Sequence, residues 1–224
     1  MSKRVYKFTS ADHGISNLEN RRVKLSTIDE LNDPFDLCSV DTTDPLLRSL
    51  VDANVQNFRG KLGILCFSRN WDNLLMWSHY GDKHAGLCMG FDIPDGPPGD
   101  GYDLDVNYQP NVIQAKASDV NPELVLRMLH TKHESWSYEQ EVRFFAKLDD
   151  PSDADGRSWF TFGPNLELRE VIIGSQCDPA VSKAIVAAAV PHGDSVKCLW
   201  AGMRRDAFLL VKDDHPPDWH GSVK

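Results

Sequence analysis

The sequence predicts a single α+β domain over residues 1–224, with a split, mostly antiparallel β-sheet core and flanking helices. Apolar runs typical of strands outnumber helical runs, and they do not alternate regularly with helices along the chain. A length of 224 residues is long for one domain and short for two. Hydrophobic residues make up 41% of the chain and charged residues 25%, which is typical of globular proteins and not of disordered ones.

Turn and cap residues divide the first part of the chain into short elements. Asp44 precedes Pro45 and is suited to cap a helix. Residues 63–68 form a continuous apolar run, which is typical of a central strand. Residues 32–34, Asn-Asp-Pro, predict a turn, because short polar side chains bond the neighbouring backbone and proline fixes φ. The predicted elements are strands at 5–9, 22–26, 63–68 and 86–93 and helices at 11–20, 44–59 and 72–80.

The second part of the chain contains one segment with an ambiguous pattern. Residues 138–147 fit a strand or a helix by periodicity, and their aromatic residues and valine favour a strand. Asp178 precedes Pro179 and predicts another capped helix. Residues 95–101, rich in glycine and proline, and the acidic residues 149–156 predict loops. The predicted elements are a strand pair at 102–108 and 111–117, a helix at 122–133, strands at 138–147, 159–162 and 168–174, a helix at 178–190, and strands at 196–202 and 207–212.

Charge and cysteine content narrow the classes of partner and compartment. The net charge of −9 argues against a protein that coats nucleic acid without sequence preference. The five cysteines include no CxxC pair, and Cys66 and Cys88 lie in apolar runs, so we expect reduced structural thiols in the cytoplasm, none of them catalytic. The N-terminus lacks a signal-peptide stretch and no apolar run could span a bilayer, so no membrane partner is expected.

Four sequence blocks occur in order along the chain: Tyr6-Lys7-Phe8, LNDPF at 31–35, the block at 66–92, and WSYEQEVRFF at 136–145. In these blocks the chain resembles a bacterial family known as domain of unknown function 2971 (DUF2971). The resemblance covers about residues 5–175 and leaves residues 176–224 as a C-terminal extension with a strand-helix-strand pattern.

The order of the blocks is also similar in outline to that of ADP-ribosyltransferases. This resemblance implies an ADP-ribosyltransferase-like fold and NAD as the donor substrate. The positions that match the outline are Tyr6 and Lys7 in the first strand, Ser68 at the end of a later strand, Tyr80 on the following helix, and Glu139 or Glu141 on a late strand. Lys7 stands where most such enzymes carry histidine or arginine.

The chemistry of ADP-ribosyl transfer explains these residue types. Breaking the bond between nicotinamide and ribose develops positive charge on the ribose, which a nearby carboxylate stabilises. An aromatic ring can stack on the nicotinamide, and a hydroxyl or a cation can hold the adenosine ribose or the pyrophosphate. We expect NAD in a cleft between the first strand and residues 136–145. The candidate binding residues are Tyr6, Lys7, Asn32, Ser68, Trp77, Tyr80 and Arg143.

Glu141 is the first candidate for the catalytic carboxylate and Glu139 the second. If this segment is a strand, both share a face with Arg143, which can pair with one carboxylate and leave the other for the ribose. Such a face either is solvated on an edge strand with ion pairs across strands, or lines a polar cleft. The neighbouring Trp136 and Tyr138 favour the cleft, because aromatic side chains suit a ribosyl ligand.

Several candidates also have a purely structural interpretation. Trp77 and Tyr80 fit core contacts of a short helix as well as a ligand site, and Asn32 fits a structural turn. Histidines at 79 and 84, and at 130 and 133, lack a third ligand at a motif spacing, so no metal site is predicted. The chain has no phosphate-loop motif and no GxSxG elbow.

These observations lead to three hypotheses. The first is a mono-ADP-ribosyltransferase acting on a macromolecular acceptor, protein or nucleic acid, or an NAD glycohydrolase of the same architecture. It would serve as a bacterial toxin or anti-phage effector, with an antitoxin or a phage protein as a further partner. The second is a non-catalytic module that senses a nucleotide or a phage protein, which Lys7 favours. The third is a nuclease that uses Glu139 and Glu141 with Mg²⁺.

Overall fold

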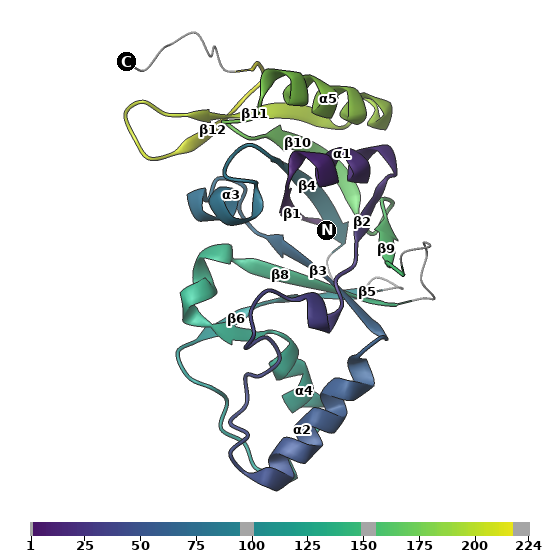
Figure 1. Cartoon of the computed structure of the whole chain (residues 1–224), viewed down its shortest axis with the longest axis vertical. Coiled ribbons are helices and arrows are strands. Elements are labelled where there is room, and N and C mark those ends of the chain that lie inside the picture. Colours follow the sequence, from purple (N-terminus) through teal and green to yellow (C-terminus); the bar gives the residue numbers. More distant parts are fainter. Residues whose placement is uncertain (1, 95–100, 149–155, 217–224) are drawn as a thin grey trace. The chain divides into compact units, whose positions relative to one another are not determined.

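The chain forms two compact units (Figure 1). The computed structural model describes residues 2–94, 101–148 and 156–216. Unit 1 consists of Met1–Val23, Phe67–Asp95 and Thr161–Lys224, and unit 2 consists of Lys24–Cys66 and Gly96–Phe160. The expectation of a single domain stays a prediction.

The elements divide between the units as follows. Unit 1 contains β1 (Ser2–Thr9), α1 (Ala11–Glu19), α3 (Leu74–Tyr80), β4 (Leu87–Pro94), β10 (Glu167–Ile173), α5 (Pro179–Ala189), η4 (Val190–His192), β11 (Lys197–Met203) and β12 (Leu210–Asp213). Unit 2 contains η1 (Ile28–Glu30), α2 (Pro45–Phe58), β5 (Gly101–Asp105), β6 (Asn107–Gln109), η2 (Ala117–Asp119), α4 (Pro122–Leu129), β7 (Thr131–His133), η3 (Glu134–Glu139) and β8 (Glu141–Lys147). Both units share β2 (Arg22–Lys24), β3 (Leu62–Ser68) and β9 (Trp159–Thr161).

Antiparallel pairing predominates among the strands. Eight strands are hydrogen-bonded in the order β12-β11-β10-β4-β1-β3-β8-β5, and β10 and β11 pair in parallel. Two smaller sheets join β2 with β9 and β6 with β7. The predicted mixed fold with a mostly antiparallel sheet is confirmed, whereas the likeness to the ADP-ribosyltransferase fold stays a prediction.

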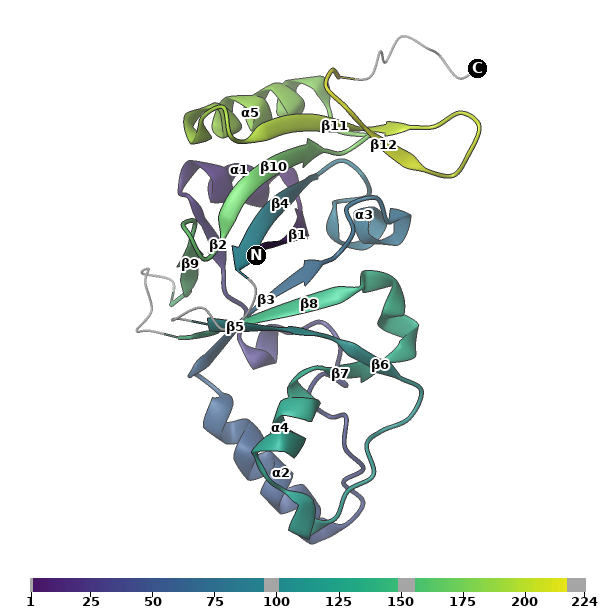
Figure 2. The same ribbon diagram turned by 180° about the vertical axis from the view of Figure 1, so that it is seen from behind.

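Strand β4 lies between β1 and β10 in unit 1 and is buried on both faces. Helix α1 packs against α5, and Figures 1 and 2 show both helices on one face of the strands. Gly14 of α1 permits a close approach to β4, because a Cβ atom there would lie 2.1 Å from Cδ2 of Leu87. The core of unit 1 therefore depends on a residue without a side chain at this contact.

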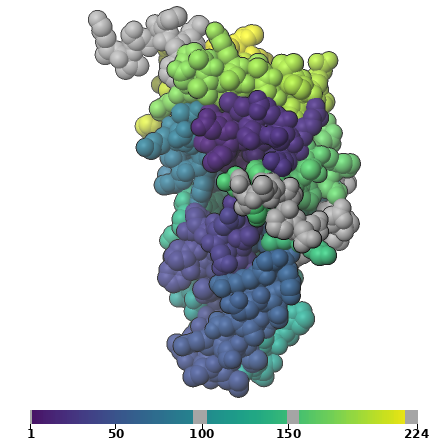
Figure 3. Space-filling model, turned by 45° about the vertical axis from the view of Figure 1, so that its right-hand side comes forward, coloured from purple at the N-terminus to yellow at the C-terminus, as the bar shows by residue number. Residues whose placement is uncertain are grey.

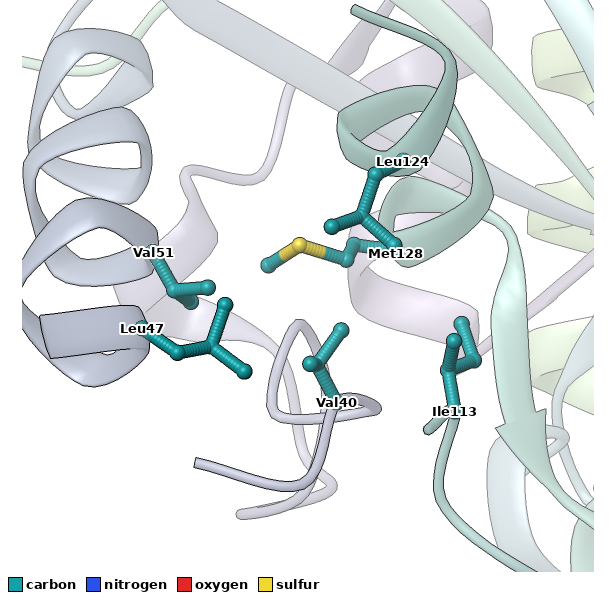
Figure 4. Close-up of a cluster of buried hydrophobic side chains, with 6 residues drawn as sticks. All are labelled: Val40, Leu47, Val51, Ile113, Leu124 and Met128. Carbon is teal, nitrogen blue, oxygen red and sulfur yellow. The ribbon is translucent and has the colours of Figure 1, made fainter. Parts of the chain in front are cut away.

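Helices α2 and α4 of unit 2 pack around a separate apolar cluster (Figure 4). Asp44 and Asn121 begin these helices, since their side chains accept the N–H groups of Leu47 (2.8 Å) and Leu124 (2.9 Å). The outer side of α2 lies at the surface (Figure 3). The cluster consists of Val40, Leu47, Val51, Ile113, Leu124 and Met128.

The predicted strand pair at 102–108 and 111–117 is wrong. Strand β5 pairs with β8, and β6 pairs in parallel with β7. Residues 111–117 form no strand of their own, and Ile113 contributes only an isolated bridge to Val40. Its side chain is buried in the cluster around α2 and α4, so its apolar character serves helix packing and not a sheet.

Two helix boundaries also differ from the prediction. The helix predicted at 122–133 ends at Leu129, and Thr131–His133 forms β7 instead. The helix predicted at 72–80 begins only at Leu74, because the Asn73 side chain accepts the first backbone N–H groups and caps it.

The caps that the sequence predicts at Asp44 and Asp178 are confirmed by side-chain bonds to the first turn of each helix. The predicted loops at 95–101 and 149–156 lie almost entirely outside the described residues. Within the described part of the chain, no helix has both the length and the apolar character that crossing a membrane requires.

Candidate functional site: an aromatic cleft and a buried ion-pair cluster

Unit 2 contains a cleft of about 650 Å³, a volume suited to a small-molecule ligand. Its walls come from residues within 33–39, 109–112 and 131–138, which belong to the turn before α2, to the end of β6, and to β7 with η3. Side chains that line it include Asp33, Phe35, Ser39, Lys132, Trp136 and Tyr138.

Lys132 connects this cleft to a buried cluster of ion pairs. Its Nζ atom lies 2.6 Å from Oε2 of Glu139 and 3.3 Å from Oε2 of Glu141. Arg143 places Nε 2.9 Å from Oε1 of Glu141 and Nη2 2.6 Å from Oδ1 of Asp36. All five side chains are at most 5% exposed. Lys132 and Arg143 thus each contact two carboxylates of the cluster.

Strand β8 presents Glu141 and Arg143 on one face, as strand alternation predicts. Phe145 on the same face packs with Leu37 and Leu129, and Nη1 of Arg143 donates to the Leu129 carbonyl oxygen (3.1 Å). The interpretation as a solvated edge strand is wrong, because β8 lies between β3 and β5 and both charged side chains are buried. The predicted pairing of Arg143 with one carboxylate is confirmed.

Glu139 reaches the cluster from η3 and not from a strand. The strand predicted over 138–147 begins only at Glu141, because η3 ends at Glu139 and Gln140 has a left-handed backbone with φ 43°. This turn directs both carboxylates to a single lysine, Lys132. Glu139 is therefore paired with a cation that the strand interpretation did not provide, and it shares this cation with Glu141.

The charges of the cluster fix one another's protonation states. Burial would raise the pKa of Glu141, but Arg143 and Lys132 outweigh it, so this pKa lies below its ordinary value. Burial prevails at Asp36, whose pKa is raised despite its contact with Arg143. Burial would lower the pKa of Lys132, but Glu141 and Glu139 outweigh it and raise that pKa. At neutral pH Lys132 is therefore a cation and Glu141 an anion.

Lys132 also holds the aromatic wall of the cleft. Its Nζ atom lies 4.6 Å from the ring centroid of Trp136, a cation–π contact, and the rings of Trp136 and Tyr138 are 6.1 Å apart. Lys132 is not among the predicted site residues, because it falls in the helix predicted at 122–133. The signal that could have pointed to Lys132 is the glutamate pair itself, since two buried glutamates require a cation within reach.

The predicted Asn-Asp-Pro turn contributes to the cleft. Oδ1 of Asp33 accepts the N–H group of Phe35 (3.0 Å), which confirms the turn. Asp33 and Phe35 both line the cleft, whereas Asn32 is exposed within the turn. The turn therefore places an acidic and an aromatic side chain at the candidate site.

Ser39 is a buried polar residue in the wall of the cleft. It is 8% exposed, and its hydroxyl has no hydrogen-bond partner among the described residues. Buried hydroxyls normally have a partner, so this one is suited to bond water or a ligand in the cleft. Cys38 beside it is exposed and also lines the cleft.

The other predicted binding residues, Tyr6, Lys7, Ser68, Trp77 and Tyr80, lie in unit 1. Trp77 is fully buried in the core. Its Nε1 donates to the Trp71 carbonyl oxygen (2.7 Å), and its ring meets Phe8 edge-on at 5.2 Å. Tyr80 is half-buried at the end of α3. The burial of Trp77 favours its structural interpretation over a stacking role.

Tyr6 and Ser68 are brought together by the pairing of β1 with β3. Ser68 is buried, and its hydroxyl accepts the N–H group of Asn70 (3.2 Å). The Nζ atom of Lys212 lies 5.3 Å from the Tyr6 ring centroid, and burial raises the pKa of Tyr6 to about 12. Lys7 is half-buried opposite Met89 of β4. The predicted cleft between β1 and residues 136–145 would join two units and stays a prediction.

Comparisons of the chain with protein-family models, with curated proteins and with solved structures gave no match. The resemblances to DUF2971 and to ADP-ribosyltransferases rest on the sequence blocks alone. Within residues 2–94, 101–148 and 156–216, no group of three or more His, Cys, Asp or Glu side chains is arranged to hold a metal ion.

Proposed function

We propose that the cleft of unit 2 binds a nucleotide with an aromatic ring, and that this ligand is NAD. The observation that carries the proposal is the Trp136 ring at the cleft, which Lys132 holds from 4.6 Å. Lys132 is itself fixed by Glu139 and Glu141. A wall held in this way needs little ordering when a ring stacks on it, which favours binding.

We further propose ADP-ribosyl transfer to a macromolecular acceptor as the reaction, in the bacterial toxin or anti-phage setting that the sequence resemblance implies. The bond between ribose and nicotinamide breaks, nicotinamide leaves, and the acceptor takes the ADP-ribose. Glu139 and Glu141 lie 2.6 and 3.3 Å from Lys132, and a carboxylate at this wall of the cleft would stabilise positive charge that develops on the ribose.

The hydrogen bonds of Glu141 favour Glu139 as the carboxylate that approaches the ligand. Glu141 accepts two bonds from Arg143 (2.9 and 3.2 Å) and one from Lys132 (3.3 Å). A carboxylate offers about four acceptor sites, so these bonds fill most of those of Glu141. Glu141 is then a positioning residue that holds Lys132, and Glu139 follows Tyr138, which lines the cleft.

The ion pairs of both glutamates support a second function, a non-catalytic module that senses NAD or a related nucleotide. A site in which both carboxylates are paired with cations can bind a ligand without cleaving it. The Mg²⁺-dependent nuclease is not proposed, because a metal ion on these carboxylates would have to displace Lys132 and Arg143.

Release of nicotinamide separates these functions. The pure protein is incubated with NAD, with and without bacterial cell lysate, while free nicotinamide and the heat of binding are measured. If the protein is an enzyme, nicotinamide should be released. Glu139→Gln should then lower the rate of this release by a factor of about 10² to 10⁴ without loss of NAD binding. The matched control is Glu30→Gln, which changes the exposed partner of Lys24. Binding of NAD without release of nicotinamide supports the sensing module. If neither binding nor release is detected, both functions are contradicted.

A further inference from the structure

We propose that unit 1 contains a ligand site of its own, which binds a small aromatic carboxylic acid in a pocket beside α5 and β11. The pocket has a volume of about 340 Å³, near the lower end of the range for small-molecule sites. All residues that line it belong to unit 1. The inference therefore does not depend on the function proposed for the cleft of unit 2.

One stripe of helix α5 forms a wall of this pocket. Pro179, Ser182 and Val186 follow one another at intervals of three and four residues, which places their side chains on one face of a helix. Lys183, next to Ser182, also lines the pocket. Strand β11, which runs along α5 in Figures 1 and 2, contributes Trp200. Two apolar side chains and an indole ring therefore share the pocket with one hydroxyl and one ammonium group.

The Trp200 ring is held in place by the helix. Its Nε1 atom donates a hydrogen bond to Oγ of Ser182 (3.0 Å), and the residue is half-buried. A ring that is already fixed loses little freedom when a ligand packs against it. Aromatic rings pack favourably on one another in stacked or edge-on arrangements, so the indole together with Val186 and Pro179 suits an aromatic body.

Ser182 has a donor to offer a ligand. Its oxygen accepts the hydrogen bond from Trp200, and a hydroxyl group can both accept and donate. Within the described part of the chain, no hydrogen bond donated by this hydroxyl is formed. An acceptor atom on the ligand, such as a carboxylate oxygen, can therefore take this hydrogen while the bond to the indole stays in place.

Lys183 gives the pocket its charge. Among the described residues that line the pocket it is the only charged one, and it forms no ion pair with any described residue. Burial raises the pKa of the Cys177 thiol, another lining group, to about 11, so this thiol is neutral at pH 7. The Asp178 carboxylate is used at the start of α5, where it accepts the N–H groups of Ala180 and Val181. The ligand that matches this pocket is therefore an anion.

The number of donors favours a carboxylate over a phosphate. One ammonium group and one hydroxyl can bond the two oxygens of a carboxylate, whose single charge one lysine balances. A phosphate carries more charge and more acceptor oxygens, and sites for it normally add arginine or several backbone N–H groups. The polar pair and the apolar walls together thus define a small acid with an aromatic body.

A titration followed by nuclear magnetic resonance tests the inference on the whole chain. The reporter is the indole N–H signal of Trp200, which is identified by its absence in Trp200→Phe. The probe is phenylacetate, and the matched ligands are phenylacetamide, which has the same shape without the charge, and acetate, which lacks the ring. We expect phenylacetate to shift this signal with a Kd on the order of 0.1–1 mM and the other two to bind at least about tenfold more weakly.

A variant of the lysine separates the charge from the apolar contacts. Lys183→Met keeps the length of the side chain and should weaken phenylacetate by about tenfold, because the ion pair is lost, while phenylacetamide is unaffected. The control is Lys197→Met, which removes an exposed lysine of β11 that does not line the pocket. This control should bind phenylacetate as the natural protein does.

Three results would overturn the inference. The first is no shift of the Trp200 signal with phenylacetate at concentrations up to about 10 mM. The second is equal binding of phenylacetate and phenylacetamide, or no effect of Lys183→Met. The third concerns residues 217–224, which follow the lining residue Pro216. If phenylacetate binds only to a chain that ends at Pro216, the pocket belongs to that segment and not to a free acid.

Discussion

The ammonium group of Lys132 lies 2.6 Å from a carboxylate oxygen of Glu139, and neither side chain is more than 5% exposed. The same lysine contacts Glu141 and the ring of Trp136. One buried cation therefore links the ion-pair cluster of unit 2 to the aromatic wall of its cleft.

Replacement of Lys132 by methionine should destabilise the protein strongly. Lys132→Met keeps the length of the side chain but leaves Glu139 and Glu141 without one of their cations, which typically costs about 3–5 kcal/mol for a buried pair. Urea unfolding measures the change. The control is Lys24→Met, whose partner Glu30 forms an exposed ion pair in the same unit, and its effect should stay below about 1 kcal/mol. Equal effects of the two variants would contradict the structural importance of the cluster.

Glu141 should make stability depend on pH in the acid range. Its pKa is lowered in the folded protein, so its stabilising contribution is present above the unfolded value of about 4.3 and is lost as the pH falls through the folded pKa. Glu141→Gln should be less stable than the natural protein at pH 7, and the difference should shrink steadily on acidification. Asp36, whose pKa is raised, acts in the opposite direction, and less so in the variant, because the charge of Glu141 contributes to that raised pKa. Urea unfolding between pH 3 and pH 7 measures the difference, and a constant gap would show that Glu141 does not carry this dependence.

Ser39→Ala should change stability and binding in opposite directions. Loss of a buried hydroxyl without a protein partner removes a desolvation cost, so the ligand-free protein should keep its stability or gain up to about 1 kcal/mol. Binding of NAD should become weaker, because the ligand loses a hydrogen bond. Thermal unfolding and calorimetry of the same sample measure both effects. A large loss of stability would mean that Ser39 has a structural partner within the protein.

The five cysteines, none of which forms a disulfide, should react at different rates with a thiol reagent. Cys38 is exposed and lines the cleft, so it should react first, and a ligand in the cleft should protect it. Cys88 is fully buried, and burial raises its pKa, so it should react only after unfolding. Mass spectrometry of timed samples identifies the labelled residues. Rapid labelling of Cys88 in the folded protein would contradict its place in the core.

Local signals in the sequence were sufficient for much of the fold. Asp44 and Asp178 each precede a proline and cap the predicted helix, because cap and first-turn preferences act within a few residues. Residues 111–117 were predicted as a strand, although Ile113 packs between helices, because alternation does not reveal which element an apolar side chain meets. Strand partners depend on contacts between distant segments, which local patterns do not contain.

The candidate site was predictable in part for the same reason. Glu141 and Arg143 share a face of β8, as their spacing of two residues required. Glu139 does not continue that strand, since Gln140 adopts a left-handed backbone that few residues other than glycine adopt readily. Lys132 could not be assigned to the pair by spacing, because it comes from β7 and reaches the glutamates only in the folded chain.

Calorimetric titration with NAD of the natural protein and of Trp136→Ala tests the central claim most directly. The cleft of unit 2 should bind NAD, and loss of the indole ring should weaken binding by about tenfold or more. Trp200→Ala removes a half-buried tryptophan of unit 1 and should leave the affinity unchanged. Equal affinity of the natural protein and Trp136→Ala, or no heat with NAD at all, would contradict the assignment of this cleft as the nucleotide site.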